Sequence, residues 1–339
     1  MDPFTHAAFG AISARLLPFA KRHKPSWILA GMAAVSPDLD LMIPYQGNIF
    51  EKQALHRFFT HTLLLLPIEA CALSWAFGYL TAGISFQKRY ALACLGIFSH
   101  IFLDVLTSGG LPFLWPFTYH RFSADLLPMV DFVFFGILLL TFSSMWRDKR
   151  FWSRAGGLFA CVYLMLAGVQ KERAIYCQQE LACQRHHQVE ASYVLPSPGN
   201  ILLWRSIYEH QGSYYVDGMR LGLSPVVCTG GSLRKATLET TGARKGTVCF
   251  YSCSIFFWMA RGCVAVVEPG VYANLCYSLL PQATDLVLVM EVKRGTTPSG
   301  ATWETCFPQF DANLWKARLQ RDGRAFFRLL WSGELLEKP

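Results

Sequence analysis

The chain has 339 residues, enough for two domains of ordinary size; 53% of them are hydrophobic and only 16% are charged. This apolar share is well above that of an ordinary soluble globular protein. The formal net charge is +8, but the basic residues of the first half stand in short clusters between apolar runs, so we do not expect nucleic-acid binding. Such clusters are typical of the cytoplasmic loops of membrane proteins.

Apolar runs in the first half predict membrane helices. They cover residues 4–20, 27–45, 62–84, 90–107, 126–146 and 151–169, and a membrane span needs about 20 such residues. The runs at 62–84, 126–146 and 151–169 carry the strongest signal, whereas the first two leave open whether they cross the bilayer or only enter it. The N-terminus lacks a basic region, so no cleavable signal peptide is expected.

The basic clusters indicate how these helices are oriented. If all six runs cross the bilayer, the clusters at 21–24, 88–89 and 147–154 fall on one face, and the short loops opposite hold fewer basic residues. The positive-inside rule makes the first face cytoplasmic. Loops on the other face should lie in the periplasm or outside the cell.

The pattern changes after residue 170 to short β-branched and aromatic runs, such as 213–216, 264–267 and 286–289, which predict strands. The apolar run at 249–260 is too short for a span. We therefore predict a mainly α fold: a helical membrane domain of about six helices at 1–170, followed by a smaller, outward-facing, β-rich extramembrane domain at 171–339. This second part holds eight cysteines, an even number that suits disulfides, although their pairing is not readable from sequence.

The sharpest local signal is the pair His100 and Asp104. Residues four apart share a helix face, so the imidazole and the carboxylate can be directed at one ion. Ionisable groups within an apolar helix are costly unless they pair, line a wet cavity or bind a metal. A buried hydrogen bond that holds two helices together is the alternative.

The segment HRFFTH, from His56 to His61, precedes the third apolar run. A spacing of five places the two imidazoles about 140° apart on an ideal helix, so both can serve one site only if the helix does not continue through them. Arg57 between them suits a phosphate or carboxylate of a substrate. The alternatives are a pair of interfacial histidines and an interfacial arginine anchor.

The segment SPDLD at 36–40 carries Asp38 and Asp40 beside a proline, where they interrupt an apolar run. These oxygens can bind one metal and a water or bridge two cations, and the alternative is a solvated turn with an N-capping aspartate. His6, with Asp2 and Thr5 beside it as outer partners, is a further candidate. All these groups fall on the predicted outer face, as do three reserve residues. The reserves are His120, Asp125 and Asp131.

Nitrogen and carboxylate ligands without cysteine suit zinc, manganese or iron, and the set is large enough for one or two ions. Such a centre supports ester or phosphodiester hydrolysis. An alternative to seven ligands is that one of Asp38, Asp40 and Asp104 acts as the general base, and Arg57 would bind substrate. The predicted metal ligands are His6, Asp38, Asp40, His56, His61, His100 and Asp104.

These motifs, His6, SPDLD at 36–40, HRFFTH at 56–61 and HIFLDVLTSGG at 100–110, resemble the bacterial family of inner-membrane, predicted metal-dependent hydrolases that includes YbcI and YdjM. The resemblance covers roughly the first 170 residues, and Pro198-Gly199-Asn200 with Trp204-Arg205 is similar to longer members. It implies a bacterial inner-membrane hydrolase with the motif histidines and aspartates as metal ligands. A weaker similarity to zinc-dependent phospholipases C and single-strand nucleases adds phosphodiesters to the expected substrates.

We therefore expect a membrane-bound metal-dependent hydrolase whose substrate is a lipid or another amphiphile, because the predicted site lies at headgroup depth. Membrane lipid is the expected partner, and the sequence does not indicate an oligomeric state. Two other classes of protein remain: a transporter or proton-coupled carrier that uses intramembrane His and Asp, and a noncatalytic membrane scaffold with a structural metal.

Overall fold

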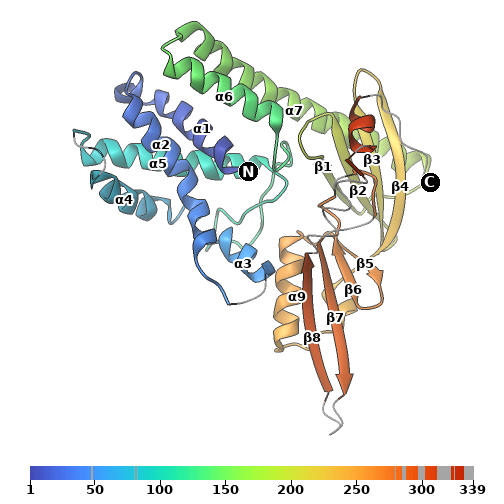
Figure 1. Cartoon of the computed structure of the whole chain (residues 1–339). Coiled ribbons are helices and arrows are strands. Elements are labelled where there is room, and N and C mark those ends of the chain that lie inside the picture. The colour runs from blue at the N-terminus through green and yellow to red at the C-terminus, as the bar shows by residue number, and fades with distance from the viewer. Residues whose placement is uncertain are drawn as a thin grey trace. The chain divides into compact units, whose positions relative to one another are not determined.

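The structure is a computed structural model that describes residues 1–46, 49–79, 81, 83–278, 280–284, 288–296, 302–310, 322–323 and 325–331. Contacts divide the chain into two compact units (Figure 1). The first comprises Met1–Gln46 and Lys52–Gly168, and the second comprises Gly47–Glu51 and Val169–Pro339. The first unit is helical and the second is rich in β-structure.

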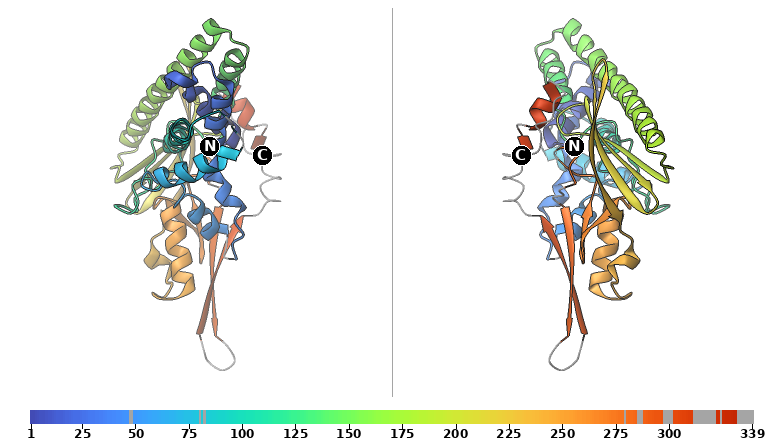
Figure 2. Two further views of the ribbon diagram at one scale, coloured as in Figure 1. Left: turned by 90° about the vertical axis from the view of Figure 1, so that its left-hand side faces the viewer. Right: turned by 90° about the vertical axis from the view of Figure 1, so that its right-hand side faces the viewer.

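The helices of the first half are α1 (Pro3–Ser13), α2 (Lys24–Val35), α3 (Ile49–His56), α4 (Leu66–Ala76), α5 (Phe86–Leu106), α6 (Phe132–Trp146) and α7 (Arg150–Gln184). Short 3₁₀ turns lie between them: η1 (Ala14–Leu16), η2 (Pro18–Ala20), η3 (Ser36–Met42) and η4 (Phe77–Tyr79). Two helix starts are capped by aspartate carboxylates, Asp2 for α1 and Asp131 for α6. A short turn joins α6 to α7 (Figures 1 and 2).

Within the described residues, α5 with 21 residues and α7 with 35 are long and apolar enough to cross a membrane. The other apolar helices are shorter. The predicted run 62–84 contains α4, which has only 11 residues, begins at Leu66 with Pro67 in its first turn and ends at Ala76. Positions 80 and 82 of that run lie outside the described residues. The helical N-terminal region is thus confirmed, and the six-span count stays a prediction.

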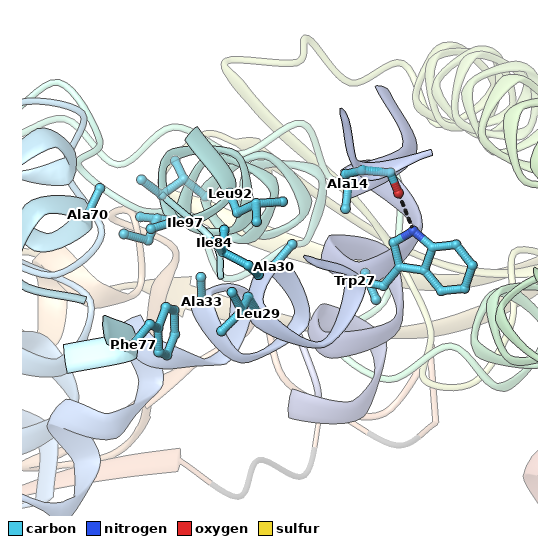
Figure 3. Close-up of a cluster of buried hydrophobic side chains, with 14 of the residues drawn as sticks. Ala14, Trp27, Leu29, Ala30, Ala33, Ala70, Phe77, Ile84, Leu92 and Ile97 are labelled. Atoms are coloured by element: carbon cyan, nitrogen blue, oxygen red, sulfur yellow. Dashed lines mark hydrogen bonds between the residues drawn. The ribbon is translucent and has the colours of Figure 1, made fainter. Parts of the chain in front are cut away.

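Small residues bring α1, α2 and α5 into close contact, and Figure 3 shows Ala30 and Ala33 of α2 in one buried cluster with Leu92 and Ile97 of α5. A Cβ atom on Gly96 of α5 would lie 2.5 Å from the Ala30 carbonyl oxygen and 2.6 Å from the Ala33 Cβ, and one on Gly10 of α1 would lie 2.5 Å from the Ala34 Cβ. No larger residue fits at either glycine without moving a helix. Packing through glycine and alanine is typical of membrane helices, and here it sets the spacing of the three helices that carry most of the candidate site.

Within its described residues, the second unit contains an eight-stranded antiparallel sheet in which consecutive strands are neighbours. Its strands are β1 (Ala191–Pro196), β2 (Leu203–His210), β3 (Ser213–Leu221), β4 (Pro225–Lys235), β5 (Val264–Glu268), β6 (Val271–Asn274), β7 (Leu288–Thr296) and β8 (Thr302–Phe310). The β-rich character of the second half is confirmed. Of the predicted strand 286–289, residues 286 and 287 lie outside the described residues.

Helices cover this sheet in two places. The end of α7 packs through Ala174 against Val194 and Trp204 of the first strands, and α9 (Val248–Met259) packs against β7 and β8 after the short helix α8 (Leu238–Thr241) (Figures 1 and 2). The helix α7 continues to Gln184, beyond the predicted start of the β-rich part, because its polar second half gains this contact with the sheet. A disulfide joins Cys249 of α9 to Cys306 of β8.

The tail motif at 198–205 has a folding role in this unit. Asn200 Oδ1 accepts hydrogen bonds from the Leu202 and Leu203 amides at 2.8 and 2.7 Å, which forms the turn before β2. Arg205 donates from Nε to the Leu275 carbonyl oxygen at 2.8 Å, and burial lowers the pKa of this guanidinium to about 10. The motif thus stabilises the connection between distant strands.

Candidate metal centre

The predicted ligands come from four separate stretches of the helical unit. His6 lies on α1, and Asp38 and Asp40 lie on η3, directly after α2. His56 ends α3 and His61 lies in the turn that follows, so the helix does not continue through the two histidines. His100 and Asp104 share one face of α5. The structure brings these residues together.

The centre of the cluster is the Asp38 carboxylate. Its Oδ1 atom lies 3.6 Å from His56 Nε2, 3.6 Å from His61 Nε2 and 3.5 Å from His100 Nε2. The Nε2 atoms of His61 and His100 are 3.0 Å apart. His61 and His100 are fully buried, so solvent does not separate these groups.

Hydrogen bonds at the opposite nitrogens determine which form each imidazole takes. His100 Nδ1 lies 2.7 Å from the Ala34 carbonyl oxygen, which only accepts, so Nδ1 carries the proton. The Thr60 hydroxyl donates to Asp40 Oδ2 at 2.6 Å and therefore accepts from His61 Nδ1, 2.9 Å away. Burial lowers the pKa of His61, which favours the neutral ring. The Nε2 atoms of His61 and His100 thus both present lone pairs to the cluster.

Asp40 orients the third imidazole. Its Oδ1 accepts a short hydrogen bond from His56 Nδ1, while its Oδ2 accepts from Thr60. A carboxylate on the outer nitrogen of a metal-binding histidine fixes the ring and its tautomer. Asp40 was predicted as a ligand or a catalytic group, and in the structure both of its oxygens are engaged by these partners.

Asp104 and His6 form the other side of the cluster. Asp104 Oδ2 lies 3.9 Å from Nε2 of both His61 and His100, and its Oδ1 lies 2.5 Å from the α-amino group of Met1. His6 Nε2 is 3.2 Å from Asp104 Oδ1, within ion-pair distance, and neither buried ring nitrogen of His6 makes a geometric hydrogen bond to the described part of the chain. The His6 and His100 rings stack with centroids 3.8 Å apart.

These groups fit a divalent metal. The Nε2 lone pairs of His61 and His100 face the Asp38 carboxylate with no donor between them, an arrangement that is costly when buried unless a cation is shared. Ligands at about 2.0–2.2 Å from zinc are themselves about 3.0–3.6 Å apart, which matches most of the separations around Asp38. Two groups of three have ligand atoms within 4.8 Å of one another: Asp38, His61 and His100, and His6, His100 and Asp104.

Two arginines lie beside this cluster. Arg57 Nη2 is 4.0 Å from Asp104 Oδ2, and its guanidinium rests against Gly109, where a Cβ atom would lie 1.8 Å from Nη1. Arg121 donates from Nη2 to the carbonyl oxygens of Gly109 and Gly110 at 3.0 and 2.7 Å. The glycine at 109 therefore provides the space that Arg57 occupies.

The reserve residues have other contacts. Asp131 caps α6 and accepts a hydrogen bond from the Tyr163 hydroxyl at 2.8 Å. Asp125 accepts from the Ser123 hydroxyl at 2.7 Å, and His120 is an exposed residue beside the Phe122 ring. Thr60, which joins Asp40 to His61, is a site residue that motif spacing does not indicate. Its position within HRFFTH, next to His61, was the available signal.

Comparison with known protein families matches the helical unit to one of them. The sequence model described as YdjM inner membrane protein matches residues 1–174, slightly more than half of the chain and the whole stretch that holds the cluster. No curated protein and no solved structure matches the chain. The resemblance inferred from the four motifs is thus confirmed, and the chain belongs to the YdjM inner membrane protein family.

Proposed function

We propose that this membrane protein is a metal-dependent hydrolase that acts at the membrane surface on an ester or phosphodiester of a lipid-like substrate. The observation that supports it best is the pair of buried imidazoles, His61 and His100, whose Nε2 lone pairs face the Asp38 carboxylate with no proton to share. A buried group of this kind needs a cation, and the donor set suits zinc, with manganese or iron as alternatives.

Each side chain then has a distinct part. Asp38, His61 and His100 would hold one ion; because His100 Nε2 has a single lone pair, a second ion would be held by His6 and Asp104 without it. A divalent ion supplies a Lewis acid that polarises the scissile group and makes water acidic enough to react near pH 7. Asp40 keeps His56 oriented, and Arg57 is close enough to bind the anionic group of a substrate through its planar fork.

A pocket beside the cluster supports an amphiphilic substrate. It has a volume of about 250 Å³, and its walls include Asp40 and His56 together with Leu55, Phe59 and Lys52. Apolar side chains with a lysine suit an acyl or other apolar group next to an anionic one. The neighbouring turn η3 exposes Leu39, Leu41 and Met42, and the chain continues into exposed Ile43, as expected of a segment that contacts lipid.

The orientation of the site is also part of the proposal. Along α2, Lys24 lies at one end, over the Trp146 ring, and Ala34, which binds His100, lies at the other. The basic residues and the cluster are therefore at opposite ends of the helical unit, and under the positive-inside rule the cluster would face the periplasm. An outward-facing second unit agrees with the Cys249–Cys306 disulfide, since such bonds persist in oxidising compartments.

The first test measures metal and hydrolysis in the purified full chain. We expect stoichiometric metal, and chelator-sensitive hydrolysis in a screen of lipid and phosphodiester substrates. The double variant His100→Ala/Asp104→Ala should lose both, whereas His120→Ala, which removes an exposed imidazole of the same unit, should keep both. Unchanged metal in the double variant would refute the site. Bound metal without hydrolysis of any screened substrate would favour a scaffold, and chelator-insensitive proton or ion flux in liposomes would favour a carrier.

A second test separates substrate binding from metal binding. Gly109→Ala places a methyl group where the Arg57 guanidinium lies, so it should displace Arg57 without touching any imidazole or carboxylate of the cluster. We expect about a tenfold loss of kcat/KM on an anionic substrate, of the order of one charge-assisted hydrogen bond, with unchanged metal content. Equal activity of Gly109→Ala and the native protein would remove Arg57 from the proposal.

A further inference from the structure

A second feature lies at the basic end of the helical unit, away from the candidate metal centre. A groove of about 530 Å³ runs between α6 and α7. Its walls include Leu140 and Ser144 of α6 and Trp152, Phe159 and Leu166 of α7, and all of these except Ser144 are exposed. The two helices therefore leave an open apolar groove along their length.

Close helix contacts hold the groove in shape. A Cβ atom on Gly156 of α7 would lie 2.1 Å from Thr141 Oγ1, so the two helices touch at this point. Further along α7, the Tyr163 hydroxyl donates to both oxygens of Asp131 at the start of α6, at 3.0 and 2.8 Å. Because the helices are fixed at these two points, the groove is a formed site.

The groove matches one acyl chain in length. Its walls on α7 extend from Trp152 to Leu166, and 14 steps of 1.5 Å give about 21 Å. One leaflet of a bilayer contributes about 15 Å of hydrocarbon. An acyl chain from a single leaflet can therefore lie along the groove with its headgroup near Ser144 and Trp152.

That end of the groove is strongly basic. Exposed Arg147, Lys149, Arg150 and Arg154 surround the turn between α6 and α7, with Asp148 as the acidic residue among them. Two more basic residues converge on the same turn within the described structure. Arg15 donates to the Ser153 hydroxyl at 2.6 Å, and Lys24 lies 4.7 Å from the centroid of the Trp146 ring.

We propose that this groove binds an anionic phospholipid, with one acyl chain between α6 and α7 and the phosphate on the basic turn. Basic residues at the membrane surface attract anionic lipids, and each added charge strengthens the attraction. A zwitterionic lipid would fill the apolar groove equally well but would leave the excess of positive charge without a partner. The same charges would repel the identical turn of a second copy of the chain. This site does not depend on the proposed hydrolysis.

Lipid retention by the purified full chain tests the proposal. Native mass spectrometry in detergent would compare phosphatidylglycerol with phosphatidylethanolamine of the same acyl chains. We expect at least a tenfold preference for phosphatidylglycerol, and its loss in the triple variant Arg147→Gln/Lys149→Gln/Arg150→Gln. A matched triple variant on exposed bases of the second unit, Arg234→Gln/Arg244→Gln/Lys245→Gln, should keep the preference.

A second variant fills the groove and leaves the charges in place. Ala155→Trp introduces an indole into the groove wall, so it should abolish retention of both lipids. Equal retention of the two lipids by the native protein would overturn the proposal and leave only unspecific lipid contact. A dimer that Ala155→Trp disrupts, without any lipid preference, would also overturn it and identify a second copy as the occupant.

Discussion

Each unit contains a buried polar cluster, and the two clusters differ in how their atoms are matched. In the second unit, Asp217 accepts from Arg185 at 2.7 and 2.9 Å and from the Gly230 amide at 3.1 Å. The helical unit has Asp38 and Asp104 facing the lone pairs of imidazoles. The cluster of the second unit pairs donors with acceptors, whereas the cluster of the helical unit consists largely of acceptors.

This difference distinguishes a polar cluster that stabilises the fold from one that could bind a ligand. A buried group whose donors and acceptors match stabilises the fold and needs nothing from outside. The contact with Asp217 raises the pKa of Arg185 above its ordinary value, which keeps this pair charged. A buried group of unmatched acceptors is costly without a cation, which is the reason for proposing a bound ion in the helical unit.

The largest expected effect is at Asp38. Asp38→Asn keeps the shape of the side chain but removes the charge next to three imidazoles. We expect at least a 100-fold loss of metal affinity, since even outer partners of a ligand contribute 10–100-fold. The new amide can donate to an Nε2 lone pair, so the metal-free variant should be as stable as the native protein or more so. Chelator competition and thermal unfolding would measure the two quantities.

The matched change in the second unit should have the opposite pattern. Asp217→Asn leaves Arg185 without its counter-charge, and we expect a loss of about 2 kcal/mol in the free energy of unfolding, below the 3–5 kcal/mol of a fully buried pair because Arg185 is partly exposed. Metal content should not change. If Asp38→Asn destabilised the metal-free protein as much as Asp217→Asn, the contrast between the two clusters would fail.

The sequence predicts the broad fold but not all of its boundaries. Apolar runs at 90–107 and 151–169 correspond to α5 and to part of α7, and the β-branched and aromatic runs at 213–216 and 264–267 correspond to β3 and β5. The end of α7 was not predictable, because its residues after Gln170 are polar and their helix is supported by a distant sheet through Ala174 and Gln178. Local patterns do not contain such contacts.

The candidate site shows the same limit. Spacing alone indicates that His100 and Asp104 share a helix face, and a spacing of five indicates that a helix cannot present His56 and His61 to one point. The distances between α1, α2 and α5 depend on Gly10 and Gly96. The sequence does not reveal this role, because it depends on which residues of the other helices lie next to these glycines. The part played by Thr60 likewise depends on Asp40, which is 20 residues away in sequence.

Thr60 gives the smallest and most specific prediction. Its hydroxyl fixes the tautomer of His61, because it donates to Asp40 and accepts from His61 Nδ1. Thr60→Val keeps the shape and removes the hydroxyl, so His61 can move its proton to Nε2, where it blocks metal binding. We expect about a tenfold loss of metal affinity, at the lower end of what outer partners contribute, with little change in stability. Thr60→Ser keeps the hydroxyl and should therefore keep the native metal affinity. A loss of affinity in Thr60→Ser would show that the packing of the Thr60 methyl group is what matters. The tautomer assignment for His61 would then be wrong.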